Sequence, residues 1–293
     1  MLLRDDAGRP PHRRRRPWRD RAVYRRRVQR SRVHARARSR AARRRRDARR
    51  PRAHDRYRRP LSRPIPERPP PVQGNRRLNV RVTSLLEGAR TATGHVVIVD
   101  VFRAFTTAAF CFAAGAREIV LVRDHEEALA MKREDPSVFL TGEIGGRPIP
   151  GFDAGNSPSV IEKLDLSRRR VVQRTSSGTQ GVAAATKAAE ILLGSLVIAS
   201  ATARYLAKAD EVTVVAMGAS AQESSEEDEV GAAFIAARLR GEPASAALEL
   251  RATEWEDWFP RRDAELALEV DRFSFALPVR RENGLLIARP VTV

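Results

Sequence analysis

The sequence predicts an α/β protein with three layers, in which a largely parallel sheet lies between two layers of helices. Along residues 78–293, short runs of apolar, β-branched residues alternate with segments of helical periodicity, which is typical of βαβ units. Near the end of the chain, the apolar segments 273–279 and 284–291 flank Asn283-Gly284, a dipeptide that favours a hairpin turn. We therefore expect a closing pair of strands there. The length fits either one large core or two lobes.

The expected elements follow this alternation in order. Strands are expected at residues 79–83, 96–100, 119–122, 138–141, 170–174, 191–198 and 212–217. Helices are expected at residues 106–114, 125–132, 180–190, 200–208 and 228–239. Because parallel strands need a crossover between them, these helices are expected to cover the faces of the sheet.

The first 77 residues differ in composition from the rest. They hold 30 arginines, no lysine and six acidic residues, with R-R-R-R at 13–16 and again at 43–46. No helical or strand periodicity is sustained, so this segment cannot bury enough apolar surface to offset its ordering entropy. We expect a disordered leader at 1–77 and a single functional region at 78–293. The latter has a small acidic excess, so the net charge of +19 comes from the leader.

Three interpretations of the leader are open. The first, which arginine without lysine favours, is that the leader is an upstream extension of a GC-rich gene with a misplaced start. The second is a solvated tail, and the third is an arm that neutralises the phosphates of RNA or DNA. We do not expect nucleic-acid binding unless the leader is a genuine part of the protein. No apolar region follows the first arginine run, and no stretch reaches the ~18 apolar residues that span a membrane, so we expect no targeting segment and no membrane contact.

Cysteine and histidine are scarce. The chain has one cysteine, Cys111, and residues 78–293 have two histidines, His95 and His125. A single cysteine excludes an internal disulfide framework and a zinc site built from cysteines. We expect Cys111 to be a small core residue in a reduced, cytoplasmic protein.

The segment V-V-I-V-D-V-F-R-A-F-T-T at 96–107 is the most informative one. Its apolar start predicts a strand buried on both faces, so Asp100 lies at a carboxyl end, where α/β proteins bind ligands. The planar fork of Arg103 suits an anion, and Thr106 and Thr107 lie near the start of the next helix, which attracts anions. The alternative is that Asp100 and Thr106 only cap the helix and that Arg103 is a solvated surface charge.

Polar loops follow three further expected strands. The long stretch 142–158 carries Glu143, Arg147, Asp153, Asn156 and Ser157, and a loop of this length is usually functional or disordered. The stretch T-S-S-G-T-Q-G at 175–181 offers hydroxyls and a glycine for an anion cradle, with an ordinary helix cap as the alternative. Glu227 and Asp228 precede a helix, where acidic residues usually interact with the helix dipole.

These loops together bring carboxylates, hydroxyls and arginines to the strand ends. Since histidine and cysteine are scarce, hard oxygen ligands predominate, and these select Mg²⁺. Mg²⁺ typically takes one or two carboxylates plus phosphate oxygens of the substrate and several waters. The sequence therefore predicts phosphate chemistry with Mg²⁺.

An ordered set of motifs resembles the 2-phosphosulfolactate phosphatase family. The motifs are D-V-F-R-A-F-T-T at 100–107, G-E-I-G-G-R at 142–147, G-F-D-A-G-N-S-P at 151–158, T-S-S-G-T at 175–179, G-S-L-V-I-A-S-A at 194–201 and E-D at 227–228. The resemblance covers residues 78–240 well and the remainder loosely, and the ordered set is specific where one motif would be weak.

The resemblance implies a Mg²⁺-dependent phosphoric monoester hydrolase that converts 2-phosphosulfolactate to sulfolactate and phosphate, a step of coenzyme M biosynthesis. The chain departs from the family pattern at Phe102, where leucine is more frequent, at 175–179, where T-T-N-G-T is more frequent, and after Met217. These departures bear on the substrate more than on the reaction type.

The candidate residues fall into three roles. Asp100 and Arg103 are the expected catalytic residues. The expected phosphate-binding residues are Thr106, Thr107, Thr175, Ser176, Ser177, Gly178, Thr179 and Asn156. The expected metal ligands are Asp100 and Asp153, with Glu143, Glu227 and Asp228 as additional or outer carboxylates. The expected partner is a small phosphorylated organic acid, and a homo-oligomer is compatible with the sequence.

Two matters stay open at this point. Water attacks phosphorus directly, or Asp100 forms an acyl phosphate, and the sequence does not distinguish these routes. The rival to an enzyme is a non-catalytic anion-binding protein, or an RNA-associated protein that acts through the arginine-rich leader.

Overall fold

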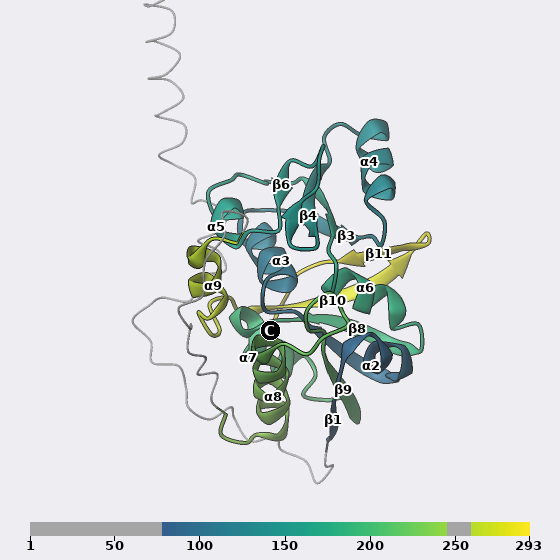
Figure 1. Cartoon of the computed structure of the whole chain (residues 1–293). Helices are drawn as coiled ribbons and strands as arrows, with labels where there is room; N and C mark the ends of the chain where they lie inside the picture. Colours follow the sequence, from purple (N-terminus) through teal and green to yellow (C-terminus); the bar gives the residue numbers. More distant parts are fainter. Residues whose placement is uncertain (1–77, 245–258) are drawn as a thin grey trace, which may run out of the picture. The chain divides into compact units, whose positions relative to one another are not determined.

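The computed structural model describes residues 78–244 and 259–293, so the expected leader lies outside the described residues. Within them the chain forms an α/β fold, in which helices cover a central sheet (Figure 1). No helix in these two ranges combines the length and the apolar character that a membrane crossing requires.

The strands are β1 (Asn79–Ser84), β2 (Gly94–Val99), β3 (Glu118–Leu121), β4 (Phe139–Ile144), β5 (Arg147–Pro148), β6 (Ala154–Gly155), β7 (Arg170–Arg174), β8 (Ala188–Gly194), β9 (Glu211–Ala216), β10 (Phe275–Glu282), β11 (Leu285–Ala288) and β12 (Val291–Thr292). The helices are α2 (Leu85–Thr91), α3 (Ala104–Ala113), α4 (His125–Glu134), α5 (Pro158–Ile161), α6 (Gly178–Ala184), the 3₁₀ turn η2 (Leu196–Ile198), α7 (Ala199–Tyr205), α8 (Glu226–Arg240) and α9 (Arg261–Ala267).

The described strands form one sheet in the order β1-β9-β2-β8-β10-β11-β3-β7-β4-β5, with β12 beside β10 and β6 beside β4. β1, β9, β2 and β8 are parallel, as are β3, β7 and β4, and the antiparallel β10–β11 hairpin joins the two parallel sets. The predicted closing strand pair is confirmed, with positive φ angles at Asn283 and Gly284 in its turn. It lies in the middle of one continuous sheet.

The side chains of β2 show why the sheet is buried on both faces. Val96 and Ile98 belong to a core cluster with residues of α2, α3 and α6, whereas Val97 and Val99 belong to a second cluster with residues of α7 and α8. A third cluster joins Val120 of β3 to α4, on the same face as α7 and α8. Strand side chains alternate between faces, so a continuous apolar run is what two helical layers require. The three-layer prediction is confirmed.

Two expected elements were wrong at their ends. The helix expected at 180–190 ends at Ala184, and β8 begins at Ala188, within the range expected for that helix. The strand expected to reach residue 198 ends at Gly194 and continues as η2. The alanine-rich sequence favours a helix locally, but β8 pairs with both β2 and β10, and this pairing overrides the local propensity. Cys111 is fully buried on α3, as predicted.

Glu118 connects the hairpin to the second parallel set. Its carboxylate, 4% exposed on β3, accepts hydrogen bonds from Arg170 of β7 at 2.7 Å and from Arg289 beyond β11 at 2.8 Å. Arg117 adds a third bond at 3.0 Å. Burial alone would raise the pKa of Glu118, but these arginines outweigh it and lower the pKa to about 2.

Replacing Glu118 by glutamine is therefore expected to lower the free energy of unfolding at neutral pH by about 2 kcal/mol, because Arg117 and Arg170 lose a charged partner and Arg289 keeps only Glu282. The pKa is lower in the folded than in the unfolded chain, so the stabilisation is complete above pH 4.5 and is lost as the pH falls toward 2. Urea unfolding of both proteins at several pH values measures this. Equal stability at pH 7 would contradict it, and the exposed Glu87→Gln is the control.

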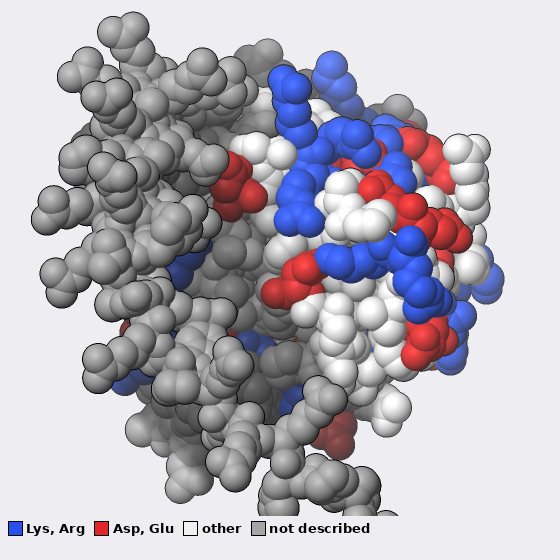
Figure 2. Space-filling view, turned by 90° about the horizontal axis from the view of Figure 1, so that it is seen from above, with Lys and Arg blue, Asp and Glu red and all other residues white. Residues whose placement is uncertain are grey.

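Charged side chains on the described surface are mixed in sign. Over the face in Figure 2, Lys and Arg lie next to Asp and Glu. Ion pairs such as Arg81 with Glu211 and Arg262 with Glu265 have this character. Such exposed pairs contribute little to stability, so we attach no structural role to them.

Candidate functional site

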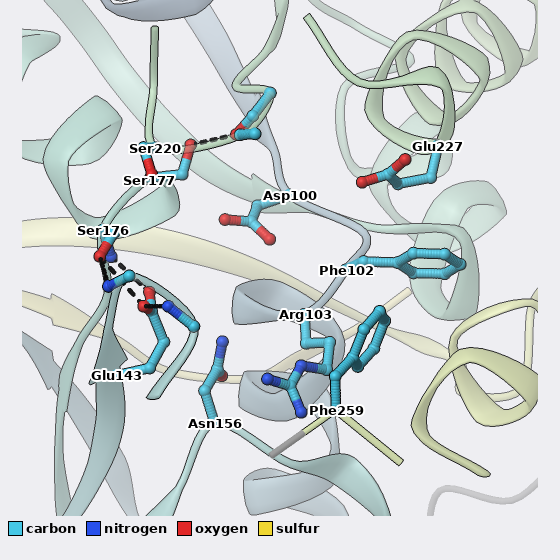
Figure 3. Close-up of a pocket in the computed structure, with 14 residues that line it drawn as sticks. Asp100, Phe102, Arg103, Glu143, Asn156, Ser176, Ser177, Ser220, Glu227 and Phe259 are labelled. Atoms are coloured by element: carbon cyan, nitrogen blue, oxygen red, sulfur yellow. Dashed lines mark hydrogen bonds between the residues drawn. The ribbon is translucent and has the colours of Figure 1, made fainter. Parts of the chain in front are cut away.

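A pocket of about 290 Å³ lies at the carboxyl ends of the parallel strands. Its walls come from the residues that follow β2, β7 and β9 and from the end of β4, so both parallel sets of the sheet contribute (Figure 3). The pocket is lined by three carboxylates, one arginine, one asparagine, three serines, small loop residues and two phenylalanines: Asp100, Glu143, Glu227, Arg103, Asn156, Ser176, Ser177, Ser220, Gly145, Gly146, Gly218, Ala219, Phe102 and Phe259.

Asp100 is held by two backbone N–H groups. Its Oδ1 accepts a hydrogen bond from the N–H of Ala104 at 2.8 Å, and its Oδ2 accepts one from the N–H of Gly178 at 2.9 Å. Burial first, and then the charges of the nearby Glu143 and Glu227 carboxylates, outweigh the lowering effect of the two N–H groups and raise the pKa of Asp100 to about 7. The carboxylates of Asp100, Glu143 and Glu227 thus lie close enough to influence one another, and a cation bound among them would stabilise their charged forms.

Glu143 connects two loops at the pocket. It accepts hydrogen bonds from the N–H groups of Ser176 at 2.5 Å and Gly146 at 2.7 Å and from the Ser176 hydroxyl at 3.0 Å. Glu227 is half-buried at the start of α8 and has no hydrogen-bond or ion-pair partner within 78–244 and 259–293. Of the three carboxylates, Asp100 and Glu227 are therefore less committed to protein contacts than Glu143.

Arg103 lies in a socket made by the C-terminal part of the chain. Its Nη1 donates to Oδ2 of Asp263 at 2.7 Å, and its guanidinium lies 4.5 Å from the ring centroid of Phe259. The side chain is 5% exposed and that of Asp263 is fully buried. A charged hydrogen bond and a cation–π contact together fix the guanidinium in one orientation.

The expected anion cradle at 175–179 has its donors in use. The N–H groups of Ser176 and Gly178 bind the protein's own carboxylates, Glu143 and Asp100. Thr175 and Thr179 hydrogen-bond each other and stay beneath the pocket surface. The Ser177 hydroxyl lies at the pocket and donates to the carbonyl of Gly218 at 2.7 Å.

Other predicted residues lie away from the pocket lining. The Thr106 hydroxyl donates to the carbonyl of Val101, and the Thr107 hydroxyl is buried without a partner among the described residues. Asp153 pairs with Lys132 and accepts from the N–H of Leu140, outside the lining.

Asp228 is buried beneath the pocket. Its Oδ1 accepts from the N–H of Val101 at 2.6 Å and its Oδ2 from the N–H of Gly218 at 2.9 Å. Burial, and then the charge of Asp100, raise the pKa of Asp228 well above its usual range. The structure thus brings Asp100, Arg103, Asn156, Glu143, Glu227, Ser176 and Ser177 together at the pocket surface, and places Asp228 where it supports two loops of the wall.

Sequence reasoning missed Asp263 and Phe259. Neither stands in a Gly-rich loop or directly after a strand, and the sequence W-F-P-R-R-D-A-E around them reads as a helix start. A buried aspartate at residue 263 inside an otherwise charged helical turn gives no local signal of its partner, because that partner is Arg103, 160 residues earlier.

Gly178 explains why glycine stands in the predicted cradle. A Cβ built there would lie 2.9 Å from Asp100 Oδ2, from the Cβ of Ala104 and from the ring of Phe105. Gly178→Ala is therefore expected to displace Asp100 and to lower stability by about 1–3 kcal/mol, since a packed site resists an extra methyl group. Thermal unfolding measures the loss. A Gly178→Ala protein as stable as wild type would contradict the tight fit.

The residues present fit a divalent cation. Among the described residues no group of three or more histidine, cysteine or carboxylate side chains is close enough to hold a metal alone. Mg²⁺ needs only one or two carboxylates, since water and substrate oxygens complete its shell. Asp100 and Glu227 are lining carboxylates that could offer such oxygens, and burial, with the charges of Glu143 and Glu227, raises the pKa of Asp100.

Comparison with known proteins agrees with this geometry. The family described as 2-phosphosulpholactate phosphatase matches residues 82–260, which include the pocket residues up to Phe259. A Deinococcus radiodurans protein named probable 2-phosphosulfolactate phosphatase is 44% identical over 125 residues, covering 42% of this chain and 52% of that protein.

Two further proteins with the same name are similar. The one from Carboxydothermus hydrogenoformans is 38% identical over 144 residues, covering 49% of this chain and 60% of that protein. The one from Bacillus subtilis is 32% identical over 145 residues, covering 50% of this chain and 64% of that protein. The matches therefore span between about half and two thirds of these relatives. Since the family match extends over more than half of the chain, the chain belongs to the 2-phosphosulpholactate phosphatase family.

Proposed function

We propose that the chain is a phosphatase that hydrolyses the phosphate monoester of a small hydroxyacid, with 2-phosphosulfolactate as the substrate that family membership favours. The observation that carries the proposal is the pocket itself. It brings the buried Asp100 and the carboxylates of Glu143 and Glu227 into one pocket with Arg103 and Asn156, at the strand ends of an α/β sheet.

We further propose that Mg²⁺ is the cofactor. A substrate with phosphate, sulfonate and carboxylate groups carries several negative charges, and the pocket contributes three more carboxylates against one arginine. Like charges brought together in one pocket repel each other strongly unless a cation lies between them. Asp100 and Glu227 would hold the ion, which would neutralise charge on the phosphoryl oxygens in the transition state.

The protein's own groups then have separate tasks. Glu143 fixes the loops at 145–146 and 176, Asp228 supports the backbone at residues 101 and 218, and Arg103 orients the substrate. In the reaction the ester P–O bond breaks, the alcohol oxygen leaves with a proton, and a water oxygen becomes bonded to phosphorus. Attack by water and attack by the Asp100 carboxylate followed by hydrolysis both balance and both fit this geometry.

The test is release of inorganic phosphate by the purified full chain with Mg²⁺. We expect turnover of 2-phosphosulfolactate well above that of sugar phosphates and nucleotides, because a 290 Å³ pocket with one arginine suits a compact acid. No release from any small phosphoester would overturn the proposal. The coenzyme M pathway and a cytoplasmic location stay predictions from the sequence resemblance and composition.

A further inference from the structure

Arg103 and Asn156 differ from the other polar groups of the pocket. The N–H groups of Gly146, Ser176 and Gly178 already bind Glu143 or Asp100. Among the described residues Arg103 is the one cationic side chain of the lining, and in Figure 3 it lies beside Asn156, across the pocket from Asp100. We call the part of the pocket lined by Arg103 and Asn156 the donor side and the part lined by Asp100 and Glu227 the carboxylate side; Glu143 lies next to Asn156 in the same view.

Asn156 is an unsatisfied buried amide. It is 5% exposed, lines the pocket, and its Oδ1 has no hydrogen-bond partner among the described residues. Leaving a buried polar atom unpaired costs about 1–3 kcal/mol, so natural proteins keep such groups where a ligand or water completes the bonding. In Figure 3 the Nδ2 of Asn156 points into the pocket, so its N–H groups are the ones that can donate to a bound anion.

Asp263 organises this side of the pocket. Besides Arg103, its carboxylate accepts the hydroxyl of Ser157 at 2.8 Å and the N–H of Ser159 at 2.9 Å, both through Oδ1. Ser157 directly follows Asn156. One fully buried carboxylate therefore fixes the guanidinium and the backbone next to the amide in a single arrangement.

The Arg103 guanidinium keeps donors for a ligand. One N–H of Nη1 is used by Asp263, and a guanidinium carries five N–H groups in a planar fork. Phe259 covers one face of the guanidinium and packs edge-on against Phe102, so water is excluded on that side and the remaining hydrogen bonds act in a low dielectric.

We propose that Arg103 and Asn156 form a subsite for a second anionic group of the substrate, a carboxylate or a sulfonate, and that Asp263 is its positioning residue. The inference rests on the proposed phosphatase function, in which the phosphoryl group lies on the carboxylate side with the cation. It assigns the donor side to the group that is not transferred. The enzyme therefore selects phosphoesters that carry another anion near the ester oxygen.

Two pairs of probes test the selection in the full chain with Mg²⁺. 2-Phospholactate and isopropyl phosphate differ by a carboxylate in place of a methyl group, and 2-sulfoethyl phosphate and propyl phosphate differ by a sulfonate. We expect the kcat/KM ratio within at least one pair to favour the anionic member by about 100-fold, since a bidentate charged contact is lost in the other. The pair with the larger ratio identifies which anion the subsite takes.

The variants Arg103→Lys and Asp263→Asn are expected to reduce that ratio by about tenfold or more, mainly through KM, because a lysine lacks the fork and an asparagine no longer fixes it. A merely structural role would lower kcat/KM for both members of a pair in proportion and leave the ratio unchanged. Such a proportional loss would overturn the subsite, as would a wild-type ratio near one in both pairs.

The chain offers matched controls for both variants. Arg272 is a buried arginine over the ring of Phe110 at 4.8 Å and paired with Glu162, outside the pocket lining. Asp271 is a buried aspartate that accepts from the N–H of Ser200 at 2.7 Å and from the Ser200 hydroxyl at 2.6 Å. Arg272→Lys and Asp271→Asn are expected to leave the ratios unchanged.

A binding measurement separates this inference from the proposed function. Calorimetric titration of the full chain with lactate and with 2-hydroxyethanesulfonate needs no turnover. If no phosphoester is hydrolysed but one of these acids binds about tenfold more weakly to Arg103→Lys than to wild type, the phosphatase function fails and the anion subsite stands. If phosphoesters are hydrolysed and neither the ratios nor the affinities respond to Arg103→Lys, the subsite fails and the phosphatase function stands.

Discussion

Replacing Asp100 by asparagine is expected to reduce kcat by at least about 100-fold while the protein stays folded, because the carboxylate is needed for the cation or the reacting phosphorus. The structure limits the cost to stability. Asparagine can accept one of the two backbone N–H bonds that hold Asp100, from Ala104 or Gly178, and it removes a buried charge whose pKa burial raises to about 7. We expect the free energy of unfolding to change by no more than about 1 kcal/mol.

Phosphate release and urea unfolding, measured on the same samples, check both parts. Asp271→Asn is the matched control, since Asp271 is also buried and accepts two hydrogen bonds but lies outside the pocket lining. Asp100→Asn with wild-type turnover would show that Asp100 serves only as a helix cap. A variant that unfolds would instead be examined as Asp100→Glu, which keeps the charge and shifts its position.

Removal of divalent cations is expected to abolish turnover. Among the described residues the pocket lining has three carboxylates and one arginine, Arg103, which is itself paired with Asp263. Without a cation, repulsion opposes both binding and the build-up of charge on the phosphoryl oxygens. After treatment with EDTA and its removal, we expect less than about 1% of the original rate, with recovery on addition of Mg²⁺ or Mn²⁺ and none with Na⁺.

The variant Glu227→Gln tests whether Glu227 is one of the residues that bind the cation. If Glu227 is a ligand, the concentration of Mg²⁺ needed for half-maximal rate rises by about 10-fold or more, since removing a ligand weakens the site. Glu126→Gln, on the exposed start of α4, should not change it. Full activity in EDTA would remove the metal from the mechanism and leave charge compensation to Arg103 alone.

Much of the fold could be predicted because its signals are local. The apolar run before Asp100 and the glycines and hydroxyls after β7 mark strand ends whatever the rest of the chain does. The sequence could not decide which carboxylate of the 142–158 loop faces the pocket. Both Glu143 and Asp153 lie in this stretch, yet Glu143, at the end of β4, accepts three hydrogen bonds at the pocket, whereas Asp153 pairs with Lys132 outside the lining.

The non-local part of the site escaped prediction for a physical reason. Asp263 of α9 meets Arg103, which directly precedes α3, because α3 and α9 both pack against α5, and no pattern within these segments encodes that contact. The 175–179 loop was predicted to bind an external anion through its hydroxyls and the close approach that Gly178 allows. In the structure the N–H groups of Ser176 and Gly178 bind Glu143 and Asp100 instead, because an N–H donor does not distinguish a carboxylate of the protein from one of a ligand.

The position of the β10–β11 hairpin has a consequence for how the pocket forms. β2 and β3 follow each other among the strands of the chain, but in the sheet β8, β10 and β11 lie between them. The parallel set that contains β2 and the one that contains β3 can therefore join only when the β10–β11 hairpin, residues 275–288, inserts between them. Loop closure over such a sequence separation is slow. During synthesis, β8 and β3 therefore expose unpaired edges until the last strands arrive, and the two walls of the pocket meet last. Pulse-labelling hydrogen exchange would register this as late protection of β10 and β11.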